Sequence, residues 1–288
     1  MKIIRKISDL RSYLKTQLRR HPLGFVPTMG DLHEGHLSLI RRSKKENKLT
    51  AVSIFVNPSQ FNNKEDFKKY FRNEKADLKA LKKEGVDLVF LPKAEELYPE
   101  GFQTWVQVEN LSQGLCGNFR PGHFKGVATV VLKLFQLVQP NVAYFGLKDY
   151  QQFKIIERMV DDLNLSVRLV PCPTVREADG LALSSRNRRL SSEERQRAAH
   201  INLALRSLSS MIKSGRVRGK SVLENRFLVE LKLTSGDKLE YLEFLHPKML
   251  TPLKLIQSPA LIVCSVWIGG TRLIDNIFMG TVPFGDSP

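Results

Sequence analysis

The sequence has few cysteines, no long apolar run and a shortage of acidic residues. Its three cysteines, Cys116, Cys172 and Cys264, lie far apart and form no CxxC pair, which predicts neither a disulfide framework nor a zinc ribbon. No stretch approaches the roughly 18 apolar residues of a membrane span, and the amino terminus lacks the apolar core of a signal peptide. These absences predict a cytoplasmic protein that has no membrane partner.

Positive charge is in excess, because 45 Lys and Arg against 29 Asp and Glu give a net charge of +16. Such a surplus attracts nucleic acid, an acidic membrane surface or small anions. The basic runs Arg41–Lys45 and Lys79–Lys83 alternate with apolar positions, as the solvated faces of amphipathic helices do. No aromatic residues interleave with them to stack on bases. We therefore expect small anionic substrates and no nucleic acid, with a basic nucleic-acid-binding protein as an alternative.

Short apolar, β-branched runs alternate with longer helical patterns over the first part of the chain. We expect strands at Gly24–Pro27, Ala51–Val56, Val86–Leu91, Val142–Phe145 and Val167–Val170. Between the third and fourth of these, apolar residues recur at helical spacing from Val127 to Val138, which predicts a helix packed on a sheet. The alternation predicts an α/β domain over residues 1–175, with a Rossmann-like parallel sheet and helices on both faces.

The pattern changes beyond about residue 175. Ser191 and Glu194 have the spacing of a capping box, which predicts the start of a long helix. Strands are expected near Leu239–Leu245, Ala260–Ile268 and Thr271–Ile277. We therefore expect a smaller α+β carboxyl-terminal domain over residues 176–288.

The most informative segment is Gly24–His36, an apolar strand that turns at a glycine and delivers two histidines. If a helix begins at Leu32 or His33, then His33 and His36 lie on one face of its first turn. Free backbone amides and the positive end of the helix dipole attract phosphates there, and imidazoles can donate to charge building on phosphorus. The HxGH pattern therefore indicates a nucleotide site. Surface residues or zinc ligands are the alternatives, but no third His or Cys lies nearby at metal-ligand spacing.

Three further segments offer polar side chains of the kinds that bind small anions. Asn57 and Gln60 follow a strand that a proline ends, and their amides suit a hydroxyl or carboxylate ligand. Lys148 would lie at a helix start, where the dipole disfavours a cation unless an anion is nearby. The hydroxyls and guanidinium of Ser184–Arg186 would form a polyphosphate cradle, with a serine-rich linker as the alternative. The loop Arg120–Val127 is either a lid or a helix lead-in.

Five short motifs occur in this order along the chain: PTMG, LHxGH, VNPxQF, FGxKDxQQ and SSRN. In their order and spacing they resemble the pantothenate synthetase (pantoate–β-alanine ligase) family, and the resemblance covers nearly the whole chain. The resemblance implies a Rossmann-like domain of the nucleotidyl transferase superfamily, a smaller domain that closes over ATP, and a homodimer. It implies that Mg-ATP and pantoate give pantoyl adenylate and pyrophosphate, after which β-alanine gives pantothenate and AMP.

The resemblance also implies the site residues. ATP would contact Met29, Gly30, Asp31, Leu32, His33, Glu34, Gly35, His36, Gly146, Leu147, Lys148, Asp149, Val175, Leu183, Ser184, Ser185 and Arg186. His36 corresponds to the residue assigned as proton donor. The chemistry adds His33, Lys148 and Arg186 as catalytic residues, because two anions must be brought together.

The resemblance implies that amide side chains hold pantoate. Gln60 and Gln152 correspond to the amides that bind pantoate, and Gln60 also to a β-alanine contact. We add Asn57 to the pantoate site. A related transferase that joins a nucleotide to a phosphate ester is an alternative, against which the two glutamines argue.

The sequence departs from the family pattern in three places. Leu147 stands where Glu is usual, Phe71 where Pro is usual, and Ala76 precedes Asp77 where two acidic residues are common. The last departure leaves the metal ligands unassigned, although Mg²⁺ is expected with ATP.

Overall fold

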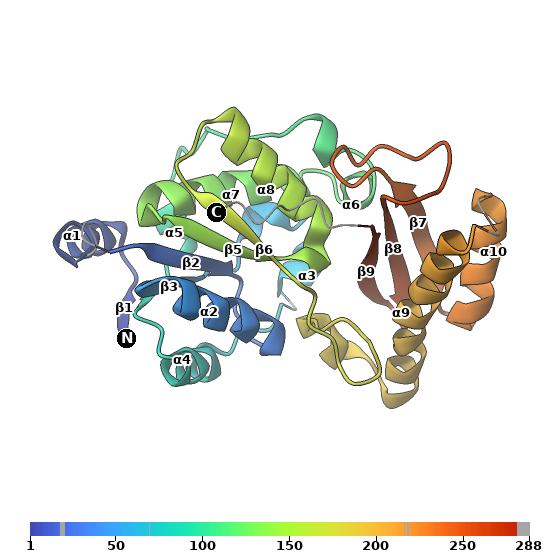
Figure 1. Cartoon of the computed structure of the whole chain (residues 1–288). Coiled ribbons are helices and arrows are strands. Elements are labelled where there is room, and N and C mark those ends of the chain that lie inside the picture. Colours follow the sequence, from blue (N-terminus) through green and yellow to red (C-terminus); the bar gives the residue numbers. More distant parts are fainter. Residues whose placement is uncertain (18–20, 69, 216, 218, 281–288) are drawn as a thin grey trace. The chain divides into compact units, whose positions relative to one another are not determined.

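The computed structural model describes residues 1–17, 21–68, 70–215, 217 and 219–280. The chain divides into two compact units (Figure 1). The first unit is Met1–Leu147 with Gln151–Pro173, and the second is Lys148–Tyr150 with Thr174–Pro288. No helix in the described part of the chain is both long enough and apolar enough to cross a bilayer.

The first unit is built on a six-stranded sheet in which every pair is parallel, as the βαβ alternation predicts. In spatial order the strands are β1 (Lys2–Ile4), β4 (Leu88–Phe90), β3 (Leu49–Ile54), β2 (Leu23–Thr28), β5 (Val142–Gly146) and β6 (Arg168–Cys172). Only β1, a short edge strand, was not predicted. From β2 the chain runs outward to one side of the sheet and then returns to build β5 and β6 on the other.

Helices cover both faces of this sheet (Figure 1). The helices between residues 1 and 162 are α1 (Ile7–Gln17), α2 (Glu34–Glu46), α3 (Lys64–Lys68), α4 (Glu74–Lys83), α5 (Ala94–Leu97), α6 (Cys116–Phe119), α7 (His123–Val138) and α8 (Tyr150–Asp162). Successive strand residues point to opposite faces. Val26 therefore packs with Ile40 of α2, whereas Phe25 meets Phe135 of α7 edge to face.

The second unit contains an antiparallel sheet of β7 (Lys238–Leu245), β8 (Ala260–Ile268) and β9 (Thr271–Met279). Against it pack α9 (Ser192–Lys213) and α10 (Lys220–Leu231), which share one apolar core with the sheet. The predicted capping box is present, since Glu194 donates its N–H to the Ser191 hydroxyl and accepts the Ser191 N–H. These elements confirm the smaller α+β unit, although α10 was not predicted.

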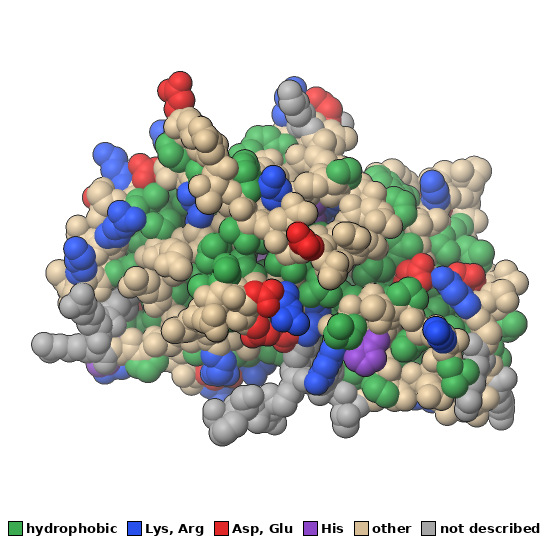
Figure 2. Space-filling model, turned by 90° about the horizontal axis from the view of Figure 1, so that it is seen from above, with side chains coloured by type: hydrophobic (Ala, Val, Ile, Leu, Met, Phe, Trp, Pro, Cys, Tyr) green, Lys and Arg blue, Asp and Glu red, His purple; other side chains and the backbone are tan. Residues whose placement is uncertain are grey.

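Many of the basic side chains are already paired with acids. In the predicted basic run on α2, Arg41 forms ion pairs with Glu34 and Glu84, and Arg42 pairs with Glu46. On the face of the molecule shown in Figure 2, Lys and Arg side chains are dispersed among apolar and neutral ones. Arg41 and Arg42 therefore lie on a solvated helix face, as the pattern predicts, and their charges are neutralised locally by acids.

Candidate active site

The HxGH segment lies where β2 ends and α2 begins, and His33 is the N-cap residue of α2. His33 Nδ1 accepts the Gly35 N–H at 3.2 Å, and His36 Nδ1 accepts the His33 N–H at 3.4 Å. The two rings lie 4.1 Å apart between centroids. Because each Nδ1 is an acceptor, a neutral ring carries its proton on Nε2. Both imidazoles are therefore set up as Nε2 donors beside the positive end of a helix.

The turn before these histidines is held by a buried carboxylate. Asp77, on α4, accepts the N–H of Asp31 at 2.9 Å on one oxygen and that of Leu32 at 2.8 Å on the other. Gly30 adopts φ of +81°, and a Cβ there would lie 2.9 Å from an Asp77 oxygen. Asp77 thus anchors the turn through two backbone bonds. Sequence reasoning had considered it only as a metal ligand and left it unassigned.

The second motif lies beside the first. Gln60, in the short 3-10 helix η1 (Pro58–Gln60), donates from Nε2 to Met29 Sδ at 2.9 Å. Asn57 is only 1% exposed, and its Nδ2 donates to Gln60 Oε1 and to Gly126 O, both at 3.1 Å. Asn57 Oδ1 accepts the N–H and the hydroxyl of Ser59. Both N–H groups of the Asn57 amide are therefore used within the chain, and one of them orients Gln60.

The Arg120–Val127 segment packs against η1 and leads into α7. His123 Nδ1 lies 2.8 Å from the Gln60 carbonyl oxygen, and Arg120 Nη2 donates to the same oxygen at 3.3 Å. A Cβ at Gly126 would lie 2.4 Å from the Ser59 carbonyl oxygen, so only glycine allows this close approach. These contacts fit the helix lead-in. They hold the Gln60 backbone, whereas Asn57 holds the Gln60 side chain.

Gln152 lies in the first turn of α8 and is half-buried. Its neighbour Gln151 is buried and ties down a loop: it accepts the Cys116 N–H and donates to the carbonyl oxygens of Leu111 and Gly114. Sequence reasoning missed this role, and the doubled glutamine is its only signal.

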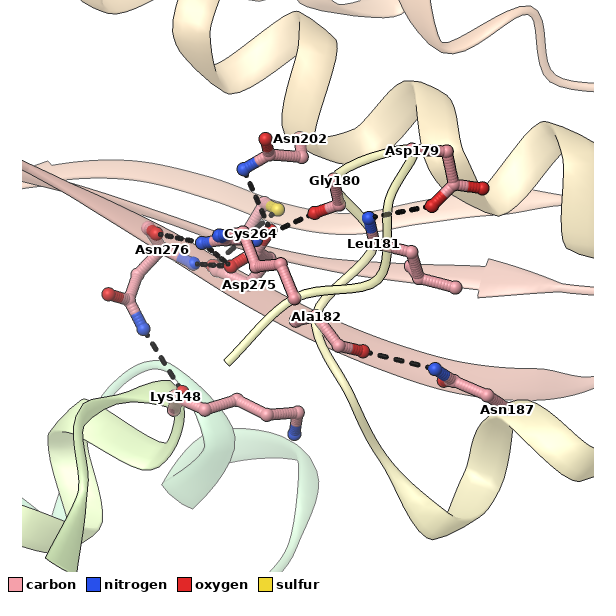
Figure 3. A network of polar contacts seen from close by, with 11 residues as sticks. Lys148, Asp179, Gly180, Leu181, Ala182, Asn187, Asn202, Cys264, Asp275 and Asn276 are labelled. Atoms are coloured by element: carbon pink, nitrogen blue, oxygen red, sulfur yellow. Dashed lines mark hydrogen bonds and ion pairs between the residues drawn. The ribbon is translucent and has the colours of Figure 1, made fainter. Parts of the chain in front are cut away.

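The second unit holds the other anticipated phosphate contacts. Val175 accepts the Leu183 N–H at 3.0 Å, and Ser184 caps the 3-10 helix η4 (Ser185–Arg189) by accepting the Arg186 N–H. A pocket in this unit is lined by Lys148, Leu181, Ala182, Ser184, Arg186, Asn187, Ile201, Arg272, Leu273, Ile274 and Asp275. Lys148, 18% exposed, therefore shares a pocket with Ser184 and Arg186. Figure 3 shows Lys148 together with other residues of the pocket lining, among them Ala182, Asn187 and Asp275.

The anticipated residues are divided between the two units. The first unit carries Met29, Gly30, Asp31, Leu32, His33, Glu34, Gly35, His36, Asn57, Gln60, Gly146, Leu147 and Gln152. The second carries Lys148, Asp149, Val175, Leu183, Ser184, Ser185 and Arg186. Among the described residues, no three His, Cys, Asp or Glu side chains are grouped so that they could hold a metal ion.

The motifs of the first unit follow the carboxyl ends of β2, β3 and β5, which are adjacent in the sheet. The order of the strands reverses between β2 and β5, and ligands of open α/β sheets bind outside the carboxyl ends of strands at such a point. Fold and site therefore define a nucleotide-binding α/β protein of the HxGH type.

A family profile described as pantoate–β-alanine ligase matches residues 2–278. A pantothenate synthetase of Pseudothermotoga lettingae is 46% identical over 282 residues, which cover 98% of this chain and 100% of that protein. The pantothenate synthetase of a Sulfurihydrogenibium species is 52% identical over 272 residues, covering 94% and 96%. The chain belongs to the pantoate–β-alanine ligase family, whose reaction is the ATP-dependent ligation of pantoate and β-alanine.

Solved structures agree with this assignment. The crystal structure of pantothenate synthetase from Thermus thermophilus matches with a TM-score of 0.90 and 44% identity, covering 96% of this chain and 99% of that one. A pantoate–β-alanine ligase from Francisella tularensis, complexed with a form of ATP and β-alanine, matches with a TM-score of 0.81 and 36% identity over 97% and 99%.

Proposed function

We propose that the chain makes pantothenate in two steps, through a pantoyl adenylate. The observation that carries this proposal is the pair of imidazoles at the start of α2, each set up as an Nε2 donor, while the Gln60 amide contacts Met29 in the same segment. Family membership favours neither the phosphate-ester transferase nor the nucleic-acid-binding alternative.

In the first step, a pantoate carboxylate oxygen attacks the α-phosphorus of ATP. The bond from this phosphorus to the bridging oxygen of the β-phosphate breaks, and pyrophosphate leaves. Because two anions must meet, catalysis rests on positioning and on offsetting negative charge. We assign this task to His33 and His36, with His36 as proton donor through Nε2, and to Lys148 and Arg186 from the second unit.

In the second step, the unprotonated amine of β-alanine attacks the acyl carbon of the adenylate. The bond from that carbon to the phosphate oxygen breaks, AMP leaves, and the nitrogen releases one proton to water as the amide forms. Water would destroy the adenylate, so we propose that the second unit closes over ATP during the reaction. Gln60 and Gln152 hold pantoate, Gln60 also contacts β-alanine, and Asn57 serves the pantoate site by orienting Gln60.

The ligands of the Francisella protein support ATP and β-alanine as ligands of this chain. Mg²⁺ would enter with ATP, because phosphate oxygens are the hard ligands that this ion prefers, and bound Mg²⁺ neutralises phosphate charge. Both Asp77 oxygens accept backbone N–H groups, so we assign Asp77 to the turn and name no protein ligand for the ion.

Three broader expectations remain proposals. We propose a homodimer, on the family resemblance, and a cytoplasmic location, on cysteine usage. All three cysteines are buried and free of disulfides, and burial raises the pKa of Cys172 to about 11. We also propose that no nucleic acid binds, and sedimentation of the protein with and without an RNA would test the first and last of these together.

The function is tested by ATP–pyrophosphate exchange across a panel of small carboxylic acids. Exchange should depend on pantoate and proceed without β-alanine, because adenylation precedes attack by the amine. No exchange with pantoate, or exchange only when β-alanine is added, would contradict the two-step route. Exchange supported by a phosphate ester in place of a carboxylic acid would favour the transferase.

A further inference from the structure

A buried ion pair lies beside the pocket of the second unit. Arg176 donates to both oxygens of Asp275, at 2.6 Å and 2.9 Å. Asp275 is 4% exposed, and Asn202 of α9 donates to it at 3.4 Å. Such a pair adds little net stability, because desolvation of the two charges offsets their attraction. Its geometry, however, constrains the backbone around it.

The ion pair holds the backbone of two separate segments (Figure 3). Arg176 donates to the Gly180 carbonyl oxygen at 3.1 Å, within the turn that precedes Ser184–Arg186. It also donates to the Asn276 carbonyl oxygen at 3.3 Å, and Asp275 accepts the Asn276 N–H at 2.7 Å. One pair of charges thus holds both the Gly180 turn, which precedes Ser184–Arg186, and the backbone of Asn276.

The side chain of Asn276 carries this constraint to Lys148. Its Nδ2 donates to the Lys148 carbonyl oxygen at 3.0 Å. Lys148 belongs to the short 3-10 helix η3 (Leu147–Asp149), and its side chain lines the pocket that also contains Ser184 and Arg186. The Lys148 backbone is therefore linked through Asn276 to the Arg176–Asp275 pair, which also holds the turn before the Ser184–Arg186 segment.

We propose that Asn276 is a positioning residue for catalysis. It aligns Lys148 with the Ser184–Arg186 segment, and the Arg176–Asp275 pair fixes Asn276 for this task. This inference rests on the proposed function, in which Lys148 and Arg186 act together on the phosphates of ATP. It goes further by assigning the alignment of Lys148 with Arg186 to Asn276, which is not among the residues proposed to contact substrate.

The test is a double-mutant cycle of Asn276→Ala and Lys148→Ala, measured as kcat and KM for pantothenate formation. Asn276→Ala should lower kcat about tenfold and leave the KM for pantoate within twofold, because pantoate is held by the first unit. In the Lys148→Ala background, Asn276→Ala should have almost no further effect, since the group that it positions is gone.

Two further variants separate positioning from folding. Asn276→Asp keeps the size of the side chain but replaces the donor with an oxygen that faces the Lys148 carbonyl, so kcat should fall at least as far. Ser207→Ala removes a 2.6 Å hydrogen bond to Glu230 elsewhere in this unit and should leave kcat unchanged.

Additive losses in the cycle, or a change below twofold in both Asn276 variants while Lys148→Ala is impaired, would overturn the inference and leave the proposed function intact. If Lys148→Ala itself turns over normally, the role of Lys148 in the proposed function is wrong, and the inference fails with it. Loss of kcat in Ser207→Ala equal to that in Asn276→Ala would assign Asn276 to stability alone.

Discussion

The HxGH turn of the first unit and the Lys148 pocket of the second are held in different ways. In the first unit, the Asp77 carboxylate accepts two backbone N–H groups of the turn. His33 and His36 each accept one further backbone N–H at the start of α2. In the second unit, the Arg176 guanidinium and the Asp275 carboxylate join segments through their charges.

The difference has consequences for how each part fails. Replacing Asp77 with Asn leaves one buried backbone N–H of the turn opposite an amide NH2, which cannot accept it. The damage should stay local, because the turn is also held by hydrogen bonds at the start of α2. Removing Asp275 leaves a guanidinium without its counter-charge and releases both segments that it held. We therefore expect single changes to be graded in the first unit and to spread further in the second.

The largest expected effect is at the two cations of the second unit. Lys148→Ala or Arg186→Ala should each lower turnover by about 10²-fold or more, because each would remove a proposed charge-assisted contact to phosphate, which should strengthen as charge develops in the transition state. Steady-state pantothenate formation measures the loss. Lys254→Ala, at an exposed position of the same unit, serves as the control. A loss below threefold at either position would assign that residue to the surface.

The next effect concerns the stability of the second unit in acid. Burial alone would raise the pKa of Asp237, but the Arg197 guanidinium and the N–H groups of Thr234 and Gly269 lower it to about 2. Because its pKa is lower in the folded chain, the ionised Asp237 carboxylate stabilises the fold at pH values above its ordinary pKa near 4. This contribution is lost as the pH falls toward 2. Asp237→Asn should therefore lower the free energy of unfolding at pH 7 by on the order of 2 kcal/mol.

Urea unfolding of the whole chain at several pH values tests this prediction. The difference in the free energy of unfolding between the native chain and Asp237→Asn should disappear between about pH 4 and pH 2. If the two units unfold in separate transitions, only one transition should move. A gap that persists unchanged at pH 2 would show that Asp237 acts through packing and not through its charge.

A smaller effect is expected at the anchor of the first unit. Asp77→Asn should lower kcat/KM for ATP about tenfold, because an amide cannot accept both backbone N–H groups of the turn. Asp87→Asn is the matched control, since Asp87 also accepts a backbone N–H, from Thr50 at 2.8 Å, but lies away from the turn. Equal losses in the two variants would mean that Asp77 has no particular role in ATP binding.

The smallest effect is expected at Leu147, where the chain departs from its family. A Glu there could orient Lys148 but would also bring negative charge near the triphosphate, so the two effects oppose each other. We expect the chain to be active as it stands and Leu147→Glu to change turnover less than about tenfold, below ~1.4 kcal/mol in barrier. If only Leu147→Glu makes pantothenate, the native chain is a non-catalytic relative.

Features set by neighbouring residues were predictable from the sequence. The apolar run at Ala260–Ile268 forms β8 with the expected bounds, and the Ser191 and Glu194 spacing forms a capping box. The helix after the HxGH turn begins at Glu34, one residue beyond the later of the two expected starts. In each case a strand period, a turn residue or a cap acts over a few residues, so the pattern is visible without tertiary structure.

Other features depended on which segments fold together. The edge strand β1 is three residues long, too short for a clear pattern, and it is defined by pairing with β4. Asp77 meets the HxGH turn across 45 and 46 residues, Arg176 meets Asp275 across 99, and Asn276 meets Lys148 across 128. Contacts at such separations leave no periodicity in the sequence. The sequence by itself thus determined every strand except β1, the order of the motifs and the family. Only the tertiary structure decided which side chains hold those motifs in place, because long-range partners are chosen by packing and not by spacing along the chain.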